Sequence, residues 1–230
     1  MLPTETINSV VAAINAAAAG ENITVAMGGA TVVPKEILEA AKGKDVNIIL
    51  DMGGYTWTIN GRNILASELK DINLEVKFDT NAIPSNVVKA LAGDNPVRQL
   101  SLTHNGDFGF KATLTMNAGA EYSGKYGNLY YYDSDGKMVF INAGTIDESG
   151  NVSLEFSHAS DYLLVMSDKQ MSQSDVPDEL QPKGEGTGAE ANTNGVKTGD
   201  ETNAVPYLVL MILCAGVAGT IVVRKKHFTK

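Results

Sequence analysis

The pattern that decides the fold appears in residues 33–50, which read Val-Pro-Lys-Glu-Ile-Leu-Glu-Ala-Ala-Lys-Gly-Lys-Asp-Val-Asn-Ile-Ile-Leu. Pro34 stands where a helix begins, because the first helical turn has N–H groups without a helical partner. Gly43 is suited to end that helix, since glycine adopts the positive φ of a helix C-cap at little cost. The apolar run over 46–50 predicts a strand. The stretch therefore indicates a short helix, a glycine stop and a strand.

The same unit recurs on both sides of this stretch. Residues 16–27 repeat its glycine and apolar positions at a shift of 23 residues, with Gly20 as the stop. A third copy, at a shift of 50, places Pro84 at the start of its helix and Gly93 after it. The first helix is also indicated by one apolar face, formed by Ile7, Val10, Val11 and Ile14. The first half of the chain is therefore expected to repeat short helices and strands.

After Gly93 the pattern changes to strands. Alternating apolar residues predict strands over 98–103, 108–116, 128–132, 138–143, 152–156 and 162–166. The dipeptides Asn105-Gly106, Asp135-Gly136 and Ser149-Gly150 lie between them and favour hairpin turns. The predicted fold class is therefore α+β, with short helix–strand repeats followed by an antiparallel, β-rich half over residues 1–167.

The C-terminal part has a different composition. Residues 168–203 are rich in small, polar and acidic side chains, which predicts a disordered linker. Residues 204–223 contain no charge and, as a helix, would span roughly 30 Å, the thickness of a hydrocarbon core. Residues 224–230 are basic, which favours a cytoplasmic tail. We therefore expect a C-terminal transmembrane helix, with the rest of the chain outside the cell.

Charge and cysteine content narrow the function classes. The formal net charge is -9, and an acidic body argues against nucleic acid as a partner. The one cysteine, Cys214, lies in the apolar run, so the body has no internal disulfide. With three histidines in all, a histidine metal cluster is not expected, and neither is a cofactor. Met1 begins no recognisable signal peptide, so an exported chain would continue a longer protein.

A short motif precedes the apolar run and gives the most specific signal. It consists of Val196, Lys197, Thr198, Gly199 and Asp200. With the apolar span and basic tail, it resembles the cell-wall sorting signals that sortases recognise in Gram-positive surface proteins. The usual Leu-Pro-x-Thr-Gly pattern is altered, because Gly195 and Val196 stand in place of Leu and Pro. The resemblance implies a sortase as partner, cleavage after Thr198 and attachment to peptidoglycan. The alternative is a plain membrane anchor at residues 204–223.

The globular region resembles modules of large secreted proteins of Clostridia-like bacteria. The similarity rests on residues 33–46, on Trp-Thr-Ile-Asn-Gly at 57–61, on 106–110 and on 157–162. It implies a position next to a cell-surface anchor and no catalytic activity. His158, Ser160 and Asp161 include the residue types of a hydrolase triad, but four consecutive positions cannot arrange them as a relay. We therefore expect an extracellular presentation module and no enzyme.

Four aromatic residues leave a binding role open. Tyr130, Tyr131 and Tyr132 follow one another in a predicted strand, so neighbouring rings point to opposite faces. Exposed rings of this kind stack on sugars or anchor a protein partner. Trp57 lies between two threonines, an alternation that also suits a core position. The two interpretations are a glycan- or host-protein-binding surface and internal packing.

Overall fold

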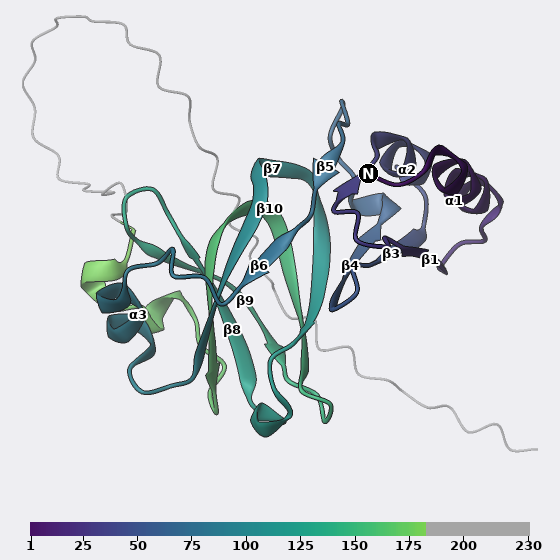
Figure 1. The fold of residues 1–230 in the computed structure, drawn as a ribbon. Coiled ribbons are helices and arrows are strands. Elements are labelled where there is room, and N and C mark those ends of the chain that lie inside the picture. Colours follow the sequence, from purple (N-terminus) through teal and green to yellow (C-terminus); the bar gives the residue numbers. More distant parts are fainter. Residues whose placement is uncertain (183–230) are drawn as a thin grey trace, which may run out of the picture. The chain divides into compact units, whose positions relative to one another are not determined.

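A computed structural model describes residues 1–182 of the chain, apart from the side chain of Asn105 (Figure 1). The helices are α1 (Thr4–Ala16), α2 (Lys35–Ala41) and α3 (Ser85–Ala92), with short 3₁₀ turns η1 (Gly61–Asn63), η2 (Ala120–Tyr122), η3 (Gln173–Asp175) and η4 (Asp178–Leu180). The strands are β1 (Glu21–Ala26), β2 (Val32–Val33), β3 (Val46–Asp51), β4 (Tyr55–Asn60), β5 (Ile72–Asn73), β6 (Val76–Phe78), β7 (Val97–Asn117), β8 (Tyr126–Tyr132), β9 (Met138–Thr145) and β10 (Asn151–Ser167).

One mixed sheet organises the described residues. Its strand order is β1-β3-β4-β7-β10-β8-β9, and β6 pairs with the first part of β7. The β1–β3 pair is parallel and α2 connects its strands, whereas the other pairs in this sheet are antiparallel. Strands β7 and β10 pair with each other along the sheet. One end of this pair lies beside β4 and the other beside β6 and β8. Both strands bend, which gives a half-barrel (Figure 1).

The long strands join segments that the sequence pattern separates. The prediction of a hairpin turn at Asn105-Gly106 is wrong, because β7 continues through this dipeptide. Gly106 and Gly109 have φ of +87° and +75°, values that let glycine bend a strand without ending it. Strand β10 shifts its register with β7 on both sides of His158 and Ala159, so the two strands bend together.

The expected fold class needs correction. The strands β7 and β10 have 21 and 17 residues, whereas the three α-helices have 13, 7 and 8. The prediction of an α+β protein with a C-terminal transmembrane helix is therefore wrong, because the described chain is mostly β. No helix within residues 1–182 is long and apolar enough to cross a membrane. Residues 204–223, to which that helix was assigned, lie outside the described residues.

Most other local predictions are confirmed. Gly20, Gly43 and Gly93 all have positive φ, between 61° and 81°. Gly43 and Gly93 lie at the ends of α2 and α3 as expected, whereas α1 ends at Ala16 and has Ala17 as its C-cap, so Gly20 belongs to the turn before β1 and does not cap the helix. Strands β1, β3 and β7 follow the three glycines. The hairpin predicted at Asp135-Gly136 joins β8 to β9. These features depend on neighbouring residues alone, which explains why the sequence predicts them.

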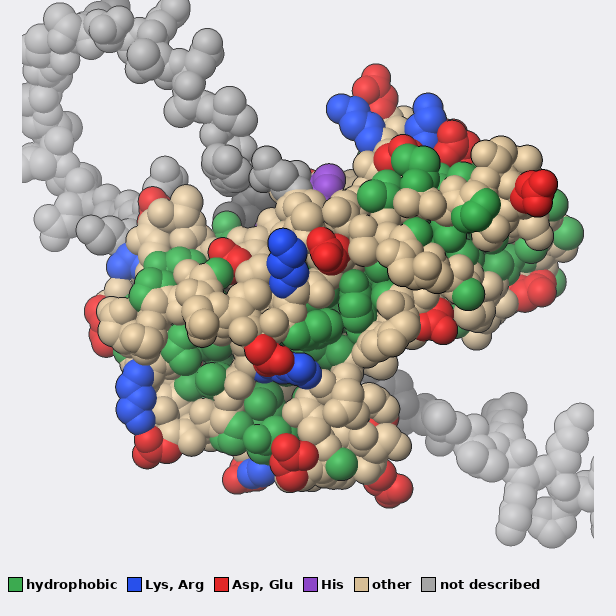
Figure 2. Space-filling model, in the orientation of Figure 1, with side chains coloured by type: hydrophobic (Ala, Val, Ile, Leu, Met, Phe, Trp, Pro, Cys, Tyr) green, Lys and Arg blue, Asp and Glu red, His purple; other side chains and the backbone are tan. Residues whose placement is uncertain are grey.

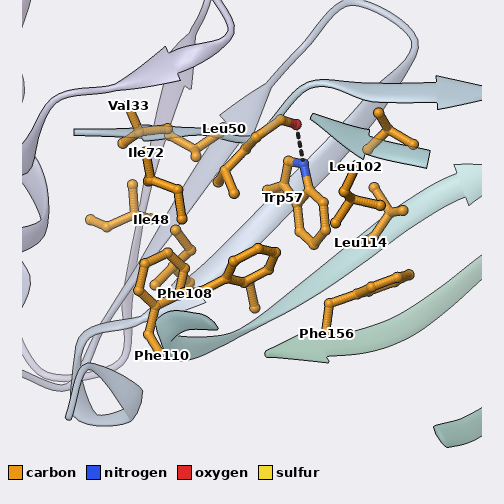
Figure 3. Packing of buried hydrophobic residues seen from close by; sticks show 14 of the residues in the cluster. Val33, Ile48, Leu50, Trp57, Ile72, Leu102, Phe108, Phe110, Leu114 and Phe156 are labelled. Carbon is orange, nitrogen blue, oxygen red and sulfur yellow. Dashed lines mark hydrogen bonds between the residues drawn. The ribbon is translucent and has the colours of Figure 1, made fainter. Parts of the chain in front are cut away.

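The larger core surrounds Trp57, which has no exposed surface (Figure 3). Its ring meets Phe156 edge-on at 5.4 Å and Phe108 at 6.1 Å between ring centroids. Its indole Nε1–H donates to the carbonyl oxygen of Leu74 at 2.9 Å, so the one polar atom of the ring is satisfied. Trp57 thereby links β4 to the middle of β7 and β10 and to the segment after β5.

A smaller core lies on the other face of β8 and β10. Helix α3 and the segment from 168 to 182 cover Tyr130, Leu163 and Val165, and the segment contributes Val176 and Leu180, 2% and 8% exposed. The linker expected to begin at residue 168 therefore overlaps the folded unit in its first part. The remainder of that linker lies outside the described residues.

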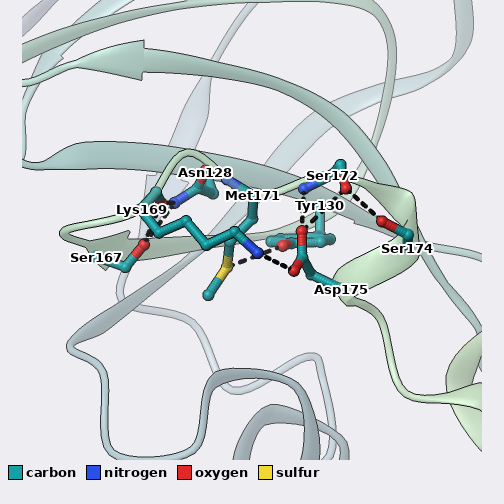
Figure 4. A network of polar contacts seen from close by, with 8 residues as sticks. All are labelled: Asn128, Tyr130, Ser167, Lys169, Met171, Ser172, Ser174 and Asp175. Atoms are coloured by element: carbon teal, nitrogen blue, oxygen red, sulfur yellow. Dashed lines mark hydrogen bonds and ion pairs between the residues drawn. The ribbon is translucent and has the colours of Figure 1, made fainter.

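Buried polar side chains hold this segment in place (Figure 4). Asn128 is fully buried, and its Oδ1 accepts from the N–H of Met171 at 2.7 Å. Its Nδ2 donates to Ser167 Oγ at 3.0 Å and to the carbonyl oxygen of Lys169 at 3.3 Å. Because a buried amide without partners is costly, Asn128 makes the fold depend on the residues after Ser167.

A close backbone approach at Gly61 gives a first prediction. A Cβ added there would lie 2.1 Å from the carbonyl oxygen of Ala41 and 2.7 Å from that of Lys44. Since backbone cannot move aside easily, Gly61→Ala should lower the free energy of unfolding by roughly 1–3 kcal/mol. Urea unfolding followed by circular dichroism measures this. Gly54→Ala is the control, because its Cβ would meet nothing within 4 Å; equal midpoints for the two variants would contradict the prediction.

Candidate functional site

The outer face of the sheet, opposite the Trp57 core, carries neutral hydrogen-bonding side chains. Alternation along β4 and β7 turns Trp57 and Leu114 inward and the threonines on either side of them outward. Strands β1, β3 and β10 continue this face. We call it the polar face, and its members are Asn22, Thr24, Asn47, Thr56, Thr58, Asn60, Thr113, Thr115, Asn117, Asn151 and Ser153.

A ladder of asparagines orders one end of the polar face. Asn60 Nδ2 donates to Asn47 Oδ1, and Asn47 Nδ2 donates to Asn22 Oδ1, each at 2.8 Å. The ladder crosses three neighbouring strands, β4, β3 and β1. It uses both polar atoms of the Asn47 amide, and it leaves Nδ2 of Asn22 without a hydrogen-bond partner among the described residues.

Hydroxyl groups fill the middle of the polar face. Register pairs Thr56 with Thr115 and Thr58 with Thr113, so four hydroxyls form two adjacent rungs. Thr115 Oγ1 lies 2.8 Å from Ser153 Oγ on the next strand. The other three threonine hydroxyls make no hydrogen bond with any side chain or backbone group of the described residues. They are available to a ligand in solution, and the surrounding sheet holds them at fixed spacing.

The composition of the polar face suits an uncharged polar ligand. Asp51, Lys111 and Glu155 share it at its margins, and Ile49 is an apolar side chain within it. On the face of the molecule drawn in Figure 2, acidic and basic side chains are scattered and do not gather into one patch. Hydroxyls and amides both donate and accept, so they complement polyhydroxylated molecules better than ions. In the sequence, the repeated Thr-x-Thr at 56–58 and 113–115 is the signal of this face.

The aromatic residues singled out from the sequence occupy mostly internal positions. Trp57 and Tyr130 are fully buried, and Tyr130 Oη donates to Met171 Sδ at 3.1 Å. Burial raises the pKa of the Tyr130 hydroxyl. Tyr131 packs against the larger core and Tyr132 against the smaller one, both half-buried. The structure therefore gives Trp57 and Tyr130 no exposed ring face, and it separates the three tyrosines onto two faces.

His158, Ser160 and Asp161, the residue types of a hydrolase triad, do not form a hydrogen-bonded relay. Ser160 Oγ donates to the carbonyl oxygen of Tyr132 at 3.5 Å. Asp161 accepts from Ser101 Oγ at 2.5 Å, on the neighbouring strand. The ring of His158 packs against Tyr131 at 4.6 Å between ring centroids. The arrangement contains no serine–histidine hydrogen bond among these residues.

Two turns that contain aspartate, after β8 and after β9, are held by hydrogen bonds from backbone N–H groups to the carboxylates. Asp133 Oδ1 accepts from the N–H groups of Asp135 and Lys137, and Asp147 Oδ1 accepts from those of Ser149 and Asn151. Both aspartates thus stabilise hairpin turns. Residues 1–182 hold no group of three or more His, Cys, Asp or Glu side chains placed to share a metal ion.

His158 gives a prediction on pH. Burial lowers the pKa of its imidazole, and the nearby carboxylate of Asp107 opposes this effect in part. Well above pH 6.5, roughly the ordinary pKa of histidine, the ring is neutral both in the folded and in the unfolded chain. As the pH falls below that value the unfolded chain takes up the proton first, so His158 makes the fold less stable. In His158→Gln, the decrease in urea midpoint between pH 7.5 and pH 5.5 should be smaller; an unchanged decrease would contradict the assignment.

Two hollows open on the surface of the described residues. One of about 390 Å³ lies between α2 and residues 67–70 and is lined by Glu39, Lys42 and Lys70. Another of about 180 Å³ lies between the end of α3 and the start of β7. Both are open, and charges of both signs line the first, so neither defines a ligand as clearly as the polar face does.

The sorting-motif residues Val196, Lys197, Thr198, Gly199 and Asp200 lie outside the described residues. The chain matches no protein-family model, no curated protein and no solved structure. The features of the chain that indicate a function are the sequence signals near its C-terminus and the polar face.

Proposed function

We propose that this chain is a surface-display module that a sortase joins to peptidoglycan through Thr198. The observation that carries the proposal is the order of three sequence signals. A polar motif with Thr198-Gly199 comes first, an uncharged apolar run over 204–223 follows, and Arg224, Lys225 and Lys226 come last. In export, the apolar run holds the chain in the membrane and the basic residues keep its end inside.

The proposed chemistry is a transfer of the Thr198 acyl group. The sortase cysteine attacks the Thr198 carbonyl, the bond to Gly199 breaks, and the amine of Gly199 leaves with the apolar run. An amine of peptidoglycan then attacks the thioester and releases the cysteine. The described residues precede the motif and fold around two hydrophobic cores, and they would be the part displayed. The module acts by presentation, without catalysis of its own.

Cell fractionation tests this proposal. The chain is produced behind an export signal in a Gram-positive host that encodes a sortase for this type of motif, and the wall and membrane fractions are compared. Thr198→Ala should move the protein from the wall fraction to the membrane fraction, because the scissile bond is no longer recognised. Thr202→Ala, four residues further on, is the matched control and should stay in the wall fraction. The same distribution for both variants would count against a sorting signal.

A second candidate function is binding of neutral glycans, or of a host protein, by the polar face. The free hydroxyls of Thr56, Thr58 and Thr113 favour it, because they stand on fixed strands beside an ordered asparagine ladder. A glycan array tests it. This function would be supported if free glycan displaces the bound glycan and if Thr58→Arg abolishes binding. The same array signal for the original chain and for Thr58→Arg would exclude the polar face as the binding surface.

A further inference from the structure

Strand β1 leaves one edge of the main sheet open. It is the terminal strand in the sheet order, and within residues 1–182 it pairs with β3 alone. Figure 1 shows β1 beside β3, at the end of the sheet next to α1. Its six residues, Glu-Asn-Ile-Thr-Val-Ala, keep an unbroken register with β3. The outer edge of β1 therefore offers a regular row of backbone groups to another strand.

The residues that face outward follow from the ladder. The N–H of Met27 donates to the carbonyl oxygen of Asp51 at 2.9 Å, directly after the end of β1. Backbone groups of alternate residues in a strand point to the same neighbour. Ile23 and Val25 therefore bond to β3, and the N–H and C=O groups of Asn22, Thr24 and Ala26 point away from it.

Strand β9, at the far end of the strand order from β1, is protected in its first part by a side chain. Gln173 Oε1 accepts from the N–H of Phe140 at 2.7 Å, and Gln173 Nε2 donates to the carbonyl oxygen of Met138 at 3.2 Å. The amide of Gln173 thus occupies the edge of β9 as a paired strand would. In contrast, β1 has no proline, lysine or bulge, the devices that usually protect an edge. The end of the strand order at β9 therefore carries a protective side chain, whereas β1 carries none of these devices.

We propose that the open edge of β1 pairs with β1 of a second copy of this chain, antiparallel, about a two-fold axis at Thr24. The register places Thr24 opposite its own symmetry mate and Asn22 opposite Ala26 of the other copy. All three residues have outward-pointing backbone groups, so each facing pair exchanges two hydrogen bonds. The pairing is closed, since the same surface is used on both copies.

Side-chain chemistry favours a second copy over an unrelated strand. Paired residues share a face in an antiparallel sheet, so this register puts Ile23 opposite Val25 on the core side. The polar face continues across the axis through Asn22 and Thr24. The one charge of β1, on Glu21, falls beyond the three facing pairs, so no like charges oppose each other. The strand is therefore complementary to itself, and this inference does not depend on the sorting signal.

Cysteine crosslinking of the full chain in non-ionic detergent tests the register. All variants carry Cys214→Ala, so the introduced thiol is the only one. In Thr24→Cys the two Cα atoms would lie about 5.5 Å apart, within the range of a disulfide. In Asn22→Cys or Ala26→Cys, each thiol would lie about 14 Å from its own symmetry mate, out of reach. Circular dichroism confirms that each variant is folded.

After mild oxidation, Thr24→Cys should run at twice the mass of one chain on a non-reducing gel. Asn22→Cys and Ala26→Cys, each oxidised alone, should run at the mass of one chain. A mixture of Asn22→Cys and Ala26→Cys chains should crosslink, which gives a second test that does not alter Thr24. Equal crosslinking of all three single variants would mean association elsewhere, for example through residues 204–223. That result, or no crosslink for either Thr24→Cys or the mixture, would overturn the proposed pairing.

Discussion

Replacing Trp57 with alanine should lower the free energy of unfolding by about 3–5 kcal/mol, the range for a buried tryptophan. The side chain is fully buried, it meets Phe108 and Phe156 edge-on, and it donates to Leu74. The truncation removes these ring contacts and leaves the carbonyl oxygen of Leu74 without this donor. Urea unfolding followed by far-ultraviolet circular dichroism measures the effect, because Trp57 is also the only tryptophan.

Two controls separate the components of this effect. Trp57→Phe keeps an aromatic ring and loses the hydrogen bond to Leu74, so its cost should be smaller. Leu65→Ala removes an apolar side chain that is 82% exposed, and it should change the free energy by less than about 0.5 kcal/mol. If Trp57→Ala and Leu65→Ala had similar midpoints, Trp57 would not lie in the core.

Ending the chain at Ser167 should cost at least about 3 kcal/mol of unfolding free energy. The deletion removes Val176 and Leu180 from the smaller core and exposes the apolar side chains beneath them. It also removes Met171 and Lys169, whose backbone groups satisfy the buried amide of Asn128.

A chain ending at Pro182 is the matched control for this truncation. It retains every described residue and should unfold at the same urea concentration as the full chain. A chain ending at Ser167 with that same midpoint would show that the segment after β10 does not stabilise the fold, and that the linker begins where the sequence alone placed it.

Local signals in the sequence account for the helices, the glycine turns and the inner and outer faces of β4. Thr56 and Thr58 flank Trp57 in a strict alternation, and a strand has that period. The merging of predicted strands into β7 was not predictable from Asn105-Gly106, because this dipeptide is typical of a hairpin turn. Pairing with β10 on both sides of this dipeptide keeps β7 extended, and that pairing joins residues far apart in the sequence.

The candidate sites were predicted less well, for the same reason. Tyr130 is buried because α3 and the segment after residue 167 cover its side of the sheet. These contacts join distant parts of the chain, so no local sequence pattern predicts them. That segment has few apolar residues, but Met171, Val176 and Leu180 are placed to meet the smaller core. The polar face requires five strands to be brought into register, so its threonines and asparagines appear unrelated in the sequence.

The most direct test of the display function is the identity of the last residue of the mature protein. The chain is isolated from purified, enzymatically digested cell walls, and its C-terminal peptide is sequenced by mass spectrometry. The proposal predicts a peptide that ends at Thr198 and carries a peptidoglycan fragment on that residue. Recovery of the protein only in detergent extracts, with Arg224, Lys225 and Lys226 still attached, would contradict it.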